Sequence, residues 1–245
     1  EEGIKDGLII DNSRPTTFKK RYMVDNQKLF RVTRMEQSSI SKSIEEKIIK
    51  ELEKSAKNAN GIVVSDFVYG VITEKILKKI HELAKINDLL LFGDLQCSSQ
   101  VGSIMKFKNF SLLCPNEREA RIALHEKDLD LESLSNKIMQ DTFSKRLIMK
   151  LGPQGFIAYD HEKNKSLSQA FPALSSNPID VAGAGDSLLA VMAVGLASSQ
   201  DMMTTSAIAC CMASMAVERM GNKQTITQKI NKYKNVDVES THSAH

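Results

Sequence analysis

The hydrophobic positions of the chain follow two spacings that alternate along most of its length. Short runs of apolar and β-branched residues are typical of buried strands, and stretches with an apolar residue every three or four positions are typical of amphipathic helices. The expected strands are 61–65, 89–92, 110–114 and 146–150. The expected helices are 39–60, 73–86, 117–125 and 130–140. This alternation predicts an α/β fold built on a mostly parallel sheet.

A hairpin precedes this alternation. Phe18–Val24 and Leu29–Val32 flank the turn Asp25-Asn26-Gln27, which predicts two antiparallel strands. Many of their residues are polar or basic, so we expect the hairpin at an edge or as a flap over a site, and not in the core.

The C-terminal part has two further features. Phe156–Tyr159 and Leu167–Phe171 predict two antiparallel strands. Residues 184–198 and 203–220 are apolar on almost every helical face, which predicts two buried helices.

Four consecutive predicted strands end in a polar residue or a glycine: Asp66, Asp94, Asn116 and Gly152. The carboxyl ends of parallel strands lie along one edge of a sheet, where ligands of such folds bind. We therefore expect these positions to line one crevice.

The segment Asp180-Val181-Ala182-Gly183-Ala184-Gly185-Asp186 is a small-residue turn leading into an apolar helix. The N–H groups at such a helix end can hold an anion. Asp186 would repel that anion unless a proton or a metal ion mediates, which suits a base working beside a phosphate. The alternative is an Asp that only caps the helix.

Two other motifs each admit a structural and a functional interpretation. Asn116 and Glu119 have the spacing of a helix capping box, and they could also lie near Mg²⁺ or its waters. The turn holding Gly152 and Gly155 is a hairpin turn or a nucleotide-contacting loop. The sequence contains neither G-x-x-x-x-G-K-[ST] nor G-x-G-x-x-G after a strand, which disfavours a P-loop or dinucleotide enzyme.

Composition narrows the class of protein further. The 245 residues suit one large domain, and a net charge of +3 gives no reason to expect nucleic-acid or membrane binding. The four cysteines lack zinc-site spacing and are expected to be reduced thiols. With no signal peptide and no membrane-spanning run in the sequence, we expect a cytoplasmic protein.

Three motifs together resemble the ribokinase (PfkB-type) carbohydrate kinase family. Residues 180–186 resemble its D-[TV]-x-G-A-G-D signature, residues 115–119 its N-x-x-E motif and residues 151–155 its L-G-x-x-G turn. Within the family, residues 65–71 and 14–31 are similar to the heptose-7-phosphate kinase branch. The resemblance extends from about Arg14 to Lys223.

The resemblance implies a ribokinase-like three-layer sandwich with a mostly parallel central sheet and a small β lid. In a single kinase domain spanning 1–245, residues 14–36 would form the lid and 61–223 the nucleotide-binding core. It further implies a sugar or sugar-phosphate substrate, ATP as phosphoryl donor, Mg²⁺, room for a monovalent cation, and a homodimer formed through the lid.

The family's residue roles carry over by motif. Asp186 matches the catalytic base, and Gly183, Ala184 and Gly185 match the anion hole. Asn116 and Glu119 match the Mg²⁺–phosphate network. The positions matched to nucleotide binding are Lys150, Gly152 and Gly155, together with Asn116 and Glu119. The positions matched to substrate binding are Asp66, Arg14 and Lys19.

Some positions depart from the family. Ala182 replaces a hydroxyl residue, Tyr69 replaces a Lys of the heptose branch, and Lys150 often corresponds to Thr. The family's first strand with a sugar-binding Asp and its Gly-Gly stretch are not found, so we expect the chain to lack these elements. Two alternatives stay open: a nucleoside or vitamin kinase of the same fold, and a non-catalytic nucleotide-binding module.

Overall fold

The fold is organised around a six-stranded sheet in a computed structural model, which describes residues 7–24, 27–96, 102–161, 166–175, 178–179, 181 and 183–218. The strands are β3 (Gly61–Asp66), β4 (Leu90–Leu95), β5 (Leu112–Leu113), β6 (Arg146–Lys150), β7 (Phe156–Asp160) and β8 (Leu167–Phe171). They lie in the order β3-β4-β5-β6-β7-β8. β3 to β6 are parallel, and β7 and β8 join antiparallel. The predicted mostly parallel sheet is confirmed.

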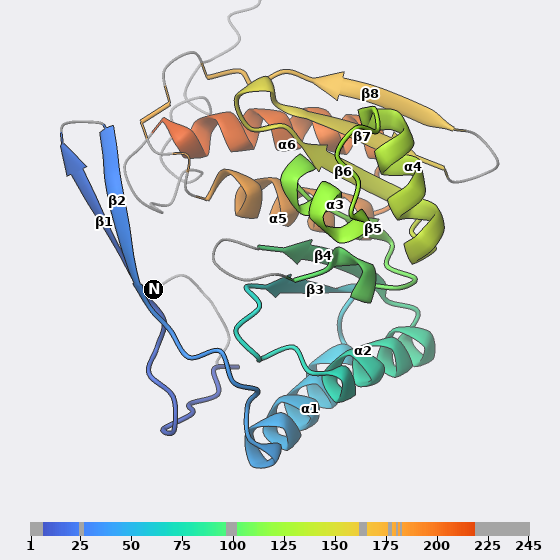
Figure 1. Cartoon of the computed structure of the whole chain (residues 1–245). Coiled ribbons are helices and arrows are strands. Elements are labelled where there is room, and N and C mark those ends of the chain that lie inside the picture. The colour runs from blue at the N-terminus through green and yellow to red at the C-terminus, as the bar shows by residue number, and fades with distance from the viewer. Residues whose placement is uncertain are drawn as a thin grey trace, which may run out of the picture.

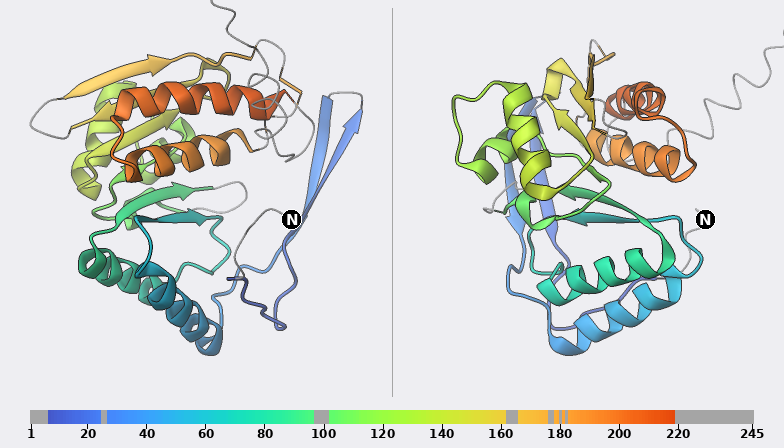
Figure 2. Two further views of the ribbon diagram at one scale, coloured as in Figure 1. Left: turned by 180° about the vertical axis from the view of Figure 1, so that it is seen from behind. Right: turned by 90° about the vertical axis from the view of Figure 1, so that its right-hand side faces the viewer.

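Helices cover both faces of the sheet, which makes three layers (Figure 1). The first layer holds α1 (Lys42–Ala56), α2 (Glu74–Asn87), α3 (Glu117–Leu124) and α4 (Leu131–Thr142). The opposite layer holds α5 (Ala184–Ala197) and α6 (Met202–Val217), and the right-hand view of Figure 2 shows the two layers apart. Two short 3₁₀ turns, η1 (Ile104–Lys106) and η2 (Gly152–Gln154), complete the described elements.

The core has one large cluster on each side of the sheet. On the first side, Ile76 of α2 and Leu134 and Ile138 of α4 pack against Leu113 and Leu147 of the sheet. On the other, residues of α5 and α6 pack against the opposite sheet face. Side chains alternate between the two faces of a strand, so each central strand packs against both clusters, and because β3 to β6 run parallel their carboxyl ends lie at one edge.

The prediction that the last two helices are buried is only half right. α5 buries Leu188 and Met192 against the sheet, but Val194 is 68% exposed, and Ile208 of α6 is 53% exposed. The two helices pack against each other and the sheet, and their outer faces are not covered by any residue that the structure describes. The expected strand over 110–114 is also shorter, with only Leu112 and Leu113 in β5.

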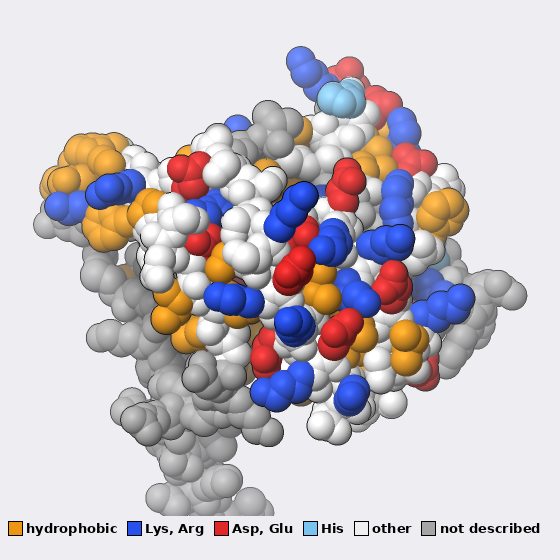
Figure 3. Space-filling model, turned by 90° about the horizontal axis from the view of Figure 1, so that it is seen from below, with side chains coloured by type: hydrophobic (Ala, Val, Ile, Leu, Met, Phe, Trp, Pro, Cys, Tyr) orange, Lys and Arg blue, Asp and Glu red, His pale blue; other side chains and the backbone are white. Residues whose placement is uncertain are grey.

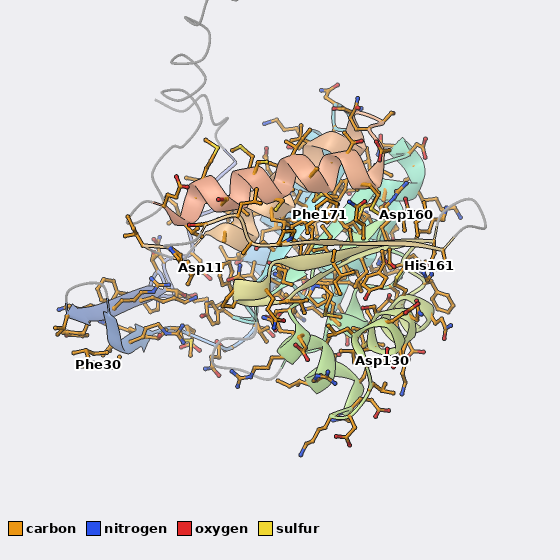
Figure 4. The ribbon with its side chains drawn as sticks, turned by 90° about the horizontal axis from the view of Figure 1, so that it is seen from above. Asp11, Phe30, Asp130, Asp160, His161 and Phe171 are labelled. Carbon is orange, nitrogen blue, oxygen red and sulfur yellow. The ribbon has the colours of Figure 1, made fainter. Side chains whose placement is uncertain are left out.

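The predicted hairpin forms as β1 (Phe18–Val24) and β2 (Gln27–Arg34), paired antiparallel as a separate sheet. It projects from the body of the protein, with Phe30 far from the sheet (Figure 4). Its exposed apolar side chains are Phe18, Tyr22, Val24, Leu29, Phe30 and Val32. The hairpin lies outside the core, as predicted.

The outer face of α1 and α2 is a different kind of surface. Lys79 pairs with Glu53 and Glu82 at 3.1 and 3.0 Å, and Lys75 pairs with Glu45. Basic and acidic side chains are interspersed over this face, while the hairpin shows mainly apolar side chains (Figure 3). Mixed charge of this kind is typical of a solvated surface. None of the helices in the described ranges is long and apolar enough to cross a membrane.

Candidate active site

Lys150, the last residue of β6, is where the strand ends meet. Its N–H donates to the carbonyl oxygen of Pro115 at 2.9 Å, and it forms a parallel bridge with Asn116. Its Nζ donates to Oδ1 of Asp94 on β4 at 2.7 Å. The ends of β4, β5 and β6 therefore converge on one residue, β4 through its side chain and β5 through its backbone. Of the four positions expected to line one crevice, Asp94 and Asn116 both contact Lys150, and Gly152 borders the same cavity as Lys150. Asp66 pairs instead with Lys106, so the prediction is met only in part.

The N-terminus of α5 lies against the same side chain. A Cβ added to Gly185 would sit 3.6 Å from Nζ of Lys150, an ordinary van der Waals distance, so the ammonium group lies directly beside the first turn of α5. The N-cap residue Gly183 has φ +86° and no side chain to cap the helix. Asp180 and Ala182 of the same motif lie outside the described residues.

The other α-helices of the described ranges differ from α5 in their capping. Each has an N-cap side chain that accepts a hydrogen bond from its first turn: Ser41, Thr73, Asn116, Asp130 and Asp201. The first N–H groups of α5 have no such cap. A helix end of this kind has donors and partial positive charge available to an anion.

Asp186 lies in the first turn of α5 and is exposed. Oδ1 of its carboxylate accepts a hydrogen bond of 2.9 Å from Nε2 of Gln96, the residue after β4. Asp186 is therefore not the capping residue, because Gly183 holds that position. Of the two interpretations of Asp186, the structure disfavours the cap.

Asn116 and Glu119 form the predicted capping box of α3. Asn116 Oδ1 accepts from the Glu119 N–H at 2.8 Å, and Glu119 Oε2 accepts from the Asn116 N–H at 2.9 Å. Glu119 is buried, and its charge contributes to raising the pKa of Lys150. The box therefore lies beside the charged centre of the site as well as at the start of α3.

A cavity of about 690 Å³ opens beside this cluster. Its wall includes Lys150 at the end of β6, Gly185 of α5, and Gly152 and Gly155 of the β6–β7 turn. Apolar residues form the rest of the wall, among them Phe156, Pro172, Leu188, Cys210 and Val217. Its charged end and apolar interior suit a ligand with a phosphate at one end and a flat apolar group at the other.

The turn between β6 and β7 shapes this cavity. Gly152 and Gly155 adopt φ of +61° and +92°. A Cβ on Gly155 would lie 2.0 Å from the Phe171 carbonyl oxygen, so glycine is required by both backbone angle and space. The hairpin-turn interpretation is confirmed, and the turn also borders the cavity.

A second polar cluster lies at the end of β3. Asp66 is buried, its Oδ1 accepts from the Val68 N–H at 2.8 Å, and its Oδ2 pairs with Nζ of Lys106. Nζ of Lys19 lies 4.7 Å from the centre of the Phe67 ring and 5.3 Å from that of Tyr69. The ammonium groups of Lys19, from the hairpin, and Lys106, from η1, therefore both lie near the carboxyl end of β3.

Arg14 lies at the base of the hairpin. Its guanidinium donates to two main-chain carbonyl oxygens, those of Glu36 and Tyr69. Arg14 therefore links the segment after β2 to the segment after β3. Its expected contact with substrate stays a prediction.

Sequence reasoning missed two residues of the site, Gln96 and Lys106. Gln96 could have been predicted, because it lies two positions after Asp94 and every second residue of a strand points to the same face of the sheet. Lys106 lies in a short 3₁₀ turn whose sequence has no periodic signal.

The architecture and the site together define an α/β protein with an uncapped helix N-terminus beside a cavity of about 690 Å³. Residues 1–229 match the pfkB family carbohydrate kinase description, and the chain belongs to this family. Its curated relatives include Bifunctional protein HldE of Campylobacter jejuni subsp. jejuni serotype O:2, 31% identical over 242 residues, which are 98% of this chain and 50% of that protein. HldE of Helicobacter acinonychis is 29% identical over 227 residues, 91% of this chain and 47% of that protein.

The chain thus spans about half the length of the curated relatives it matches. Among solved structures, phosphofructokinase-2 of Escherichia coli with substrates and products aligns with a TM-score of 0.70 at 18% identity, covering 89% of this chain and 70% of that one. Ribokinase of Giardia lamblia aligns with a TM-score of 0.68 at 16% identity, covering 90% and 73%. These confirm the ribokinase-like fold.

Proposed function

We propose that this chain is the kinase part of an ATP-dependent phosphotransferase that phosphorylates a hydroxyl group of a sugar or sugar phosphate. The observation that carries the proposal is the uncapped N-terminus of α5, with Asp186 in its first turn and Lys150 beneath it. Membership of the carbohydrate kinase family supports the reaction class.

The reaction assigns a role to each end of the site. Asp186 takes the proton of the acceptor hydroxyl, whose oxygen attacks the γ-phosphorus of ATP. The bond from the γ-phosphorus to the β,γ-bridging oxygen breaks, and ADP leaves with that electron pair. The N–H groups of Gly183, Ala184 and Gly185 stabilise charge on the transferring phosphoryl group. Gly152 and Gly155 border the part of the cavity proposed for the adenine nucleoside.

The donor set fits a magnesium ion that keeps most of its waters. The described residues hold no cluster of three or more His, Cys, Asp or Glu side chains able to ligate a metal ion. Mg²⁺ needs only one or two protein oxygens when phosphates and water supply the rest. Asn116 and Glu119 would lie nearest to it, and when bound it would neutralise phosphate charge. The family resemblance also implies a monovalent cation, to which we assign no residues.

The substrate proposal is a sugar phosphate of the heptose 7-phosphate type. The sequence similarity at 65–71 and 14–31 supports it, as do the HldE relatives. Lys19 and Lys106 beside buried Asp66 provide positive charge for a phosphate and a carboxylate for sugar hydroxyls. The hydroxyl of Tyr69 is buried and has no hydrogen-bond partner among the described residues, so a polar substrate group can satisfy it.

The test is ATP turnover by the full-length protein against a panel of sugars, sugar phosphates, nucleosides and vitamin alcohols, with Asp186→Asn as the variant. We expect phosphorylation of a sugar phosphate, and a loss of about 10²–10⁴-fold in kcat for the variant with ATP binding retained. Wild-type rates in Asp186→Asn would remove Asp186 as the base. Binding of ATP without turnover of any acceptor would favour the non-catalytic module.

A further inference from the structure

An ion pair joins Asp94 to Lys150 at the wall of the cavity, and the role assigned to it below rests on the proposed function. Asp94 is completely buried on β4, and the Lys150 side chain is 18% exposed. Only Oδ1 of Asp94 receives the Lys150 hydrogen bond; Oδ2 is buried with no partner among the described residues. Burying an ion pair costs several kcal/mol of desolvation per ion, so such pairs are poor stabilisers of a fold. A different role is needed to explain this one.

The position of the ammonium group supplies that role. It lies beside Gly185 at the positive end of α5, at the wall of the nucleotide-sized cavity. An ammonium facing a helix N-terminus is repelled unless an anion lies between or beside them. Asp94 supplies one negative charge from the sheet side. An anion entering from the cavity side would meet both the ammonium and the helix N–H groups.

The surrounding groups keep Lys150 charged. Burial alone would lower the pKa of Lys150, but the neighbouring Asp94 carboxylate and, more weakly, Glu119 raise it above its usual value. The Cys114 thiol on the same sheet edge is fully buried, and burial raises its pKa so that it stays neutral. The ammonium therefore faces Asp94, Glu119 and a neutral thiol from the elements packed around it.

We propose that Asp94 is a positioning residue that fixes the Lys150 ammonium beneath the α5 N-terminus, where this ammonium binds a phosphate oxygen of the nucleotide during transfer. An ammonium has three donors, and the bond to Asp94 uses one. Asp94 thus sets the position of a charge that acts on phosphate, without touching the nucleotide itself.

The experiment is a double-mutant cycle of Lys150→Met and Asp94→Asn in the full-length protein. Readouts are Tm, the Kd values of ATP and of adenosine by calorimetry, and the kcat and KM of turnover. The matched control is the pair Arg146 and Asp160, 3.6 Å apart at the opposite end of β6. Arg146→Met with Asp160→Asn is expected to leave ATP affinity unchanged.

We expect Lys150→Met to weaken ATP about 10- to 100-fold, as for loss of a hydrogen bond to a charged group, with adenosine affinity unchanged. Asp94→Asn should lower kcat with a smaller change in ATP affinity. We expect the double variant to have a Tm closer to that of wild type than either single variant has, but an ATP affinity as weak as that of Lys150→Met. Lys150→Arg should bind ATP more tightly than Lys150→Met and less tightly than wild type.

Recovery of both Tm and ATP affinity in the double variant would overturn the inference and leave a structural ion pair. So would equal ATP affinity in wild type and Lys150→Met, or no ATP binding by wild type. Failure of the proposed function looks different: ATP would bind through Lys150 as described, and no acceptor would be phosphorylated.

Discussion

The side-chain amide of Gln96 and the carboxylate of Asp186 are joined by a hydrogen bond of 2.9 Å from Nε2 to Oδ1. They come from positions 90 residues apart, the end of β4 and the first turn of α5. The amide holds one carboxylate oxygen, and the other is the one that we propose takes the proton of the substrate hydroxyl. Gln96 therefore fixes the direction of the proposed base.

Replacing Gln96 should lower turnover without abolishing the fold. We expect Gln96→Met to reduce kcat about tenfold, since a hydrogen bond to a charged group contributes about 1.5–3 kcal/mol and this one is exposed. Gln96→Glu should cost more, because a second carboxylate repels both Asp186 and phosphate. Steady-state kinetics measure both. Gln140→Met, on the exposed end of α4, is the control, and an unchanged kcat in both Gln96 variants would contradict the role.

Glu119 allows the capping and magnesium roles to be separated. Glu119→Gln keeps an oxygen that can accept from the Asn116 N–H, so helix stability should change little. Its charge is lost, so we expect the Mg²⁺ concentration for half-maximal turnover to rise severalfold. Glu119→Ala should also lose about 1 kcal/mol of unfolding free energy.

The control for Glu119 is Asp130, the N-cap of α4, whose Oδ1 accepts from Ser133 at 2.8 Å. Asp130→Asn retains a capping oxygen and should leave the Mg²⁺ dependence unchanged. If Glu119→Gln behaves in the same way, Glu119 is a capping residue alone.

The two glycines of the β6–β7 turn should differ in their tolerance of a side chain. Gly152→Ala meets no atom within 4 Å and should cost about 1 kcal/mol for its positive φ. Gly155→Ala would place Cβ against the Phe171 carbonyl and should cost about 3 kcal/mol or more, or prevent folding. Urea unfolding measures both, and equal midpoints would show that the turn adjusts.

The exposed hairpin should govern association of two copies. Its apolar side chains lie on a two-stranded sheet, an arrangement that is only marginally stable alone. We expect Phe30→Glu to raise the dimer dissociation constant at least tenfold by sedimentation. Ile86→Glu is the control, since Ile86 is 77% exposed on α2, away from the hairpin. A monomeric wild type would reject the lid-mediated dimer.

Much of the architecture could be predicted because strand and helix spacings differ so clearly. The polar ends of β4, β5 and β6 could be placed together by topology alone. The sequence could not show that Lys150 is the residue on which they converge, because that depends on strand register and on side-chain direction at a strand end. Nor could it show that α5 and α6 leave Val194 and Ile208 exposed: apolar composition indicates which residues can be buried, and packing decides which faces are covered.

The substrate contacts expected of Arg14 and Lys19 rest on family resemblance alone and stay predictions. Arg14 donates to carbonyl oxygens of Glu36 and Tyr69, contacts that have no signature in the sequence. The same is true of Lys106 and its pairing with Asp66. Long-range contacts of single side chains depend on tertiary structure, which periodicity does not encode.

The Arg14 contacts have a mechanical consequence. The Arg14 guanidinium donates to the carbonyl oxygen of Glu36, just after the hairpin, and to that of Tyr69, in the segment that follows β3. A rotation of the hairpin about its base would therefore pull on the loop that carries Phe67 and Tyr69, whose rings Lys19 overlies. A displacement of the hairpin and a displacement of the Phe67–Tyr69 segment would thus be coupled through one side chain.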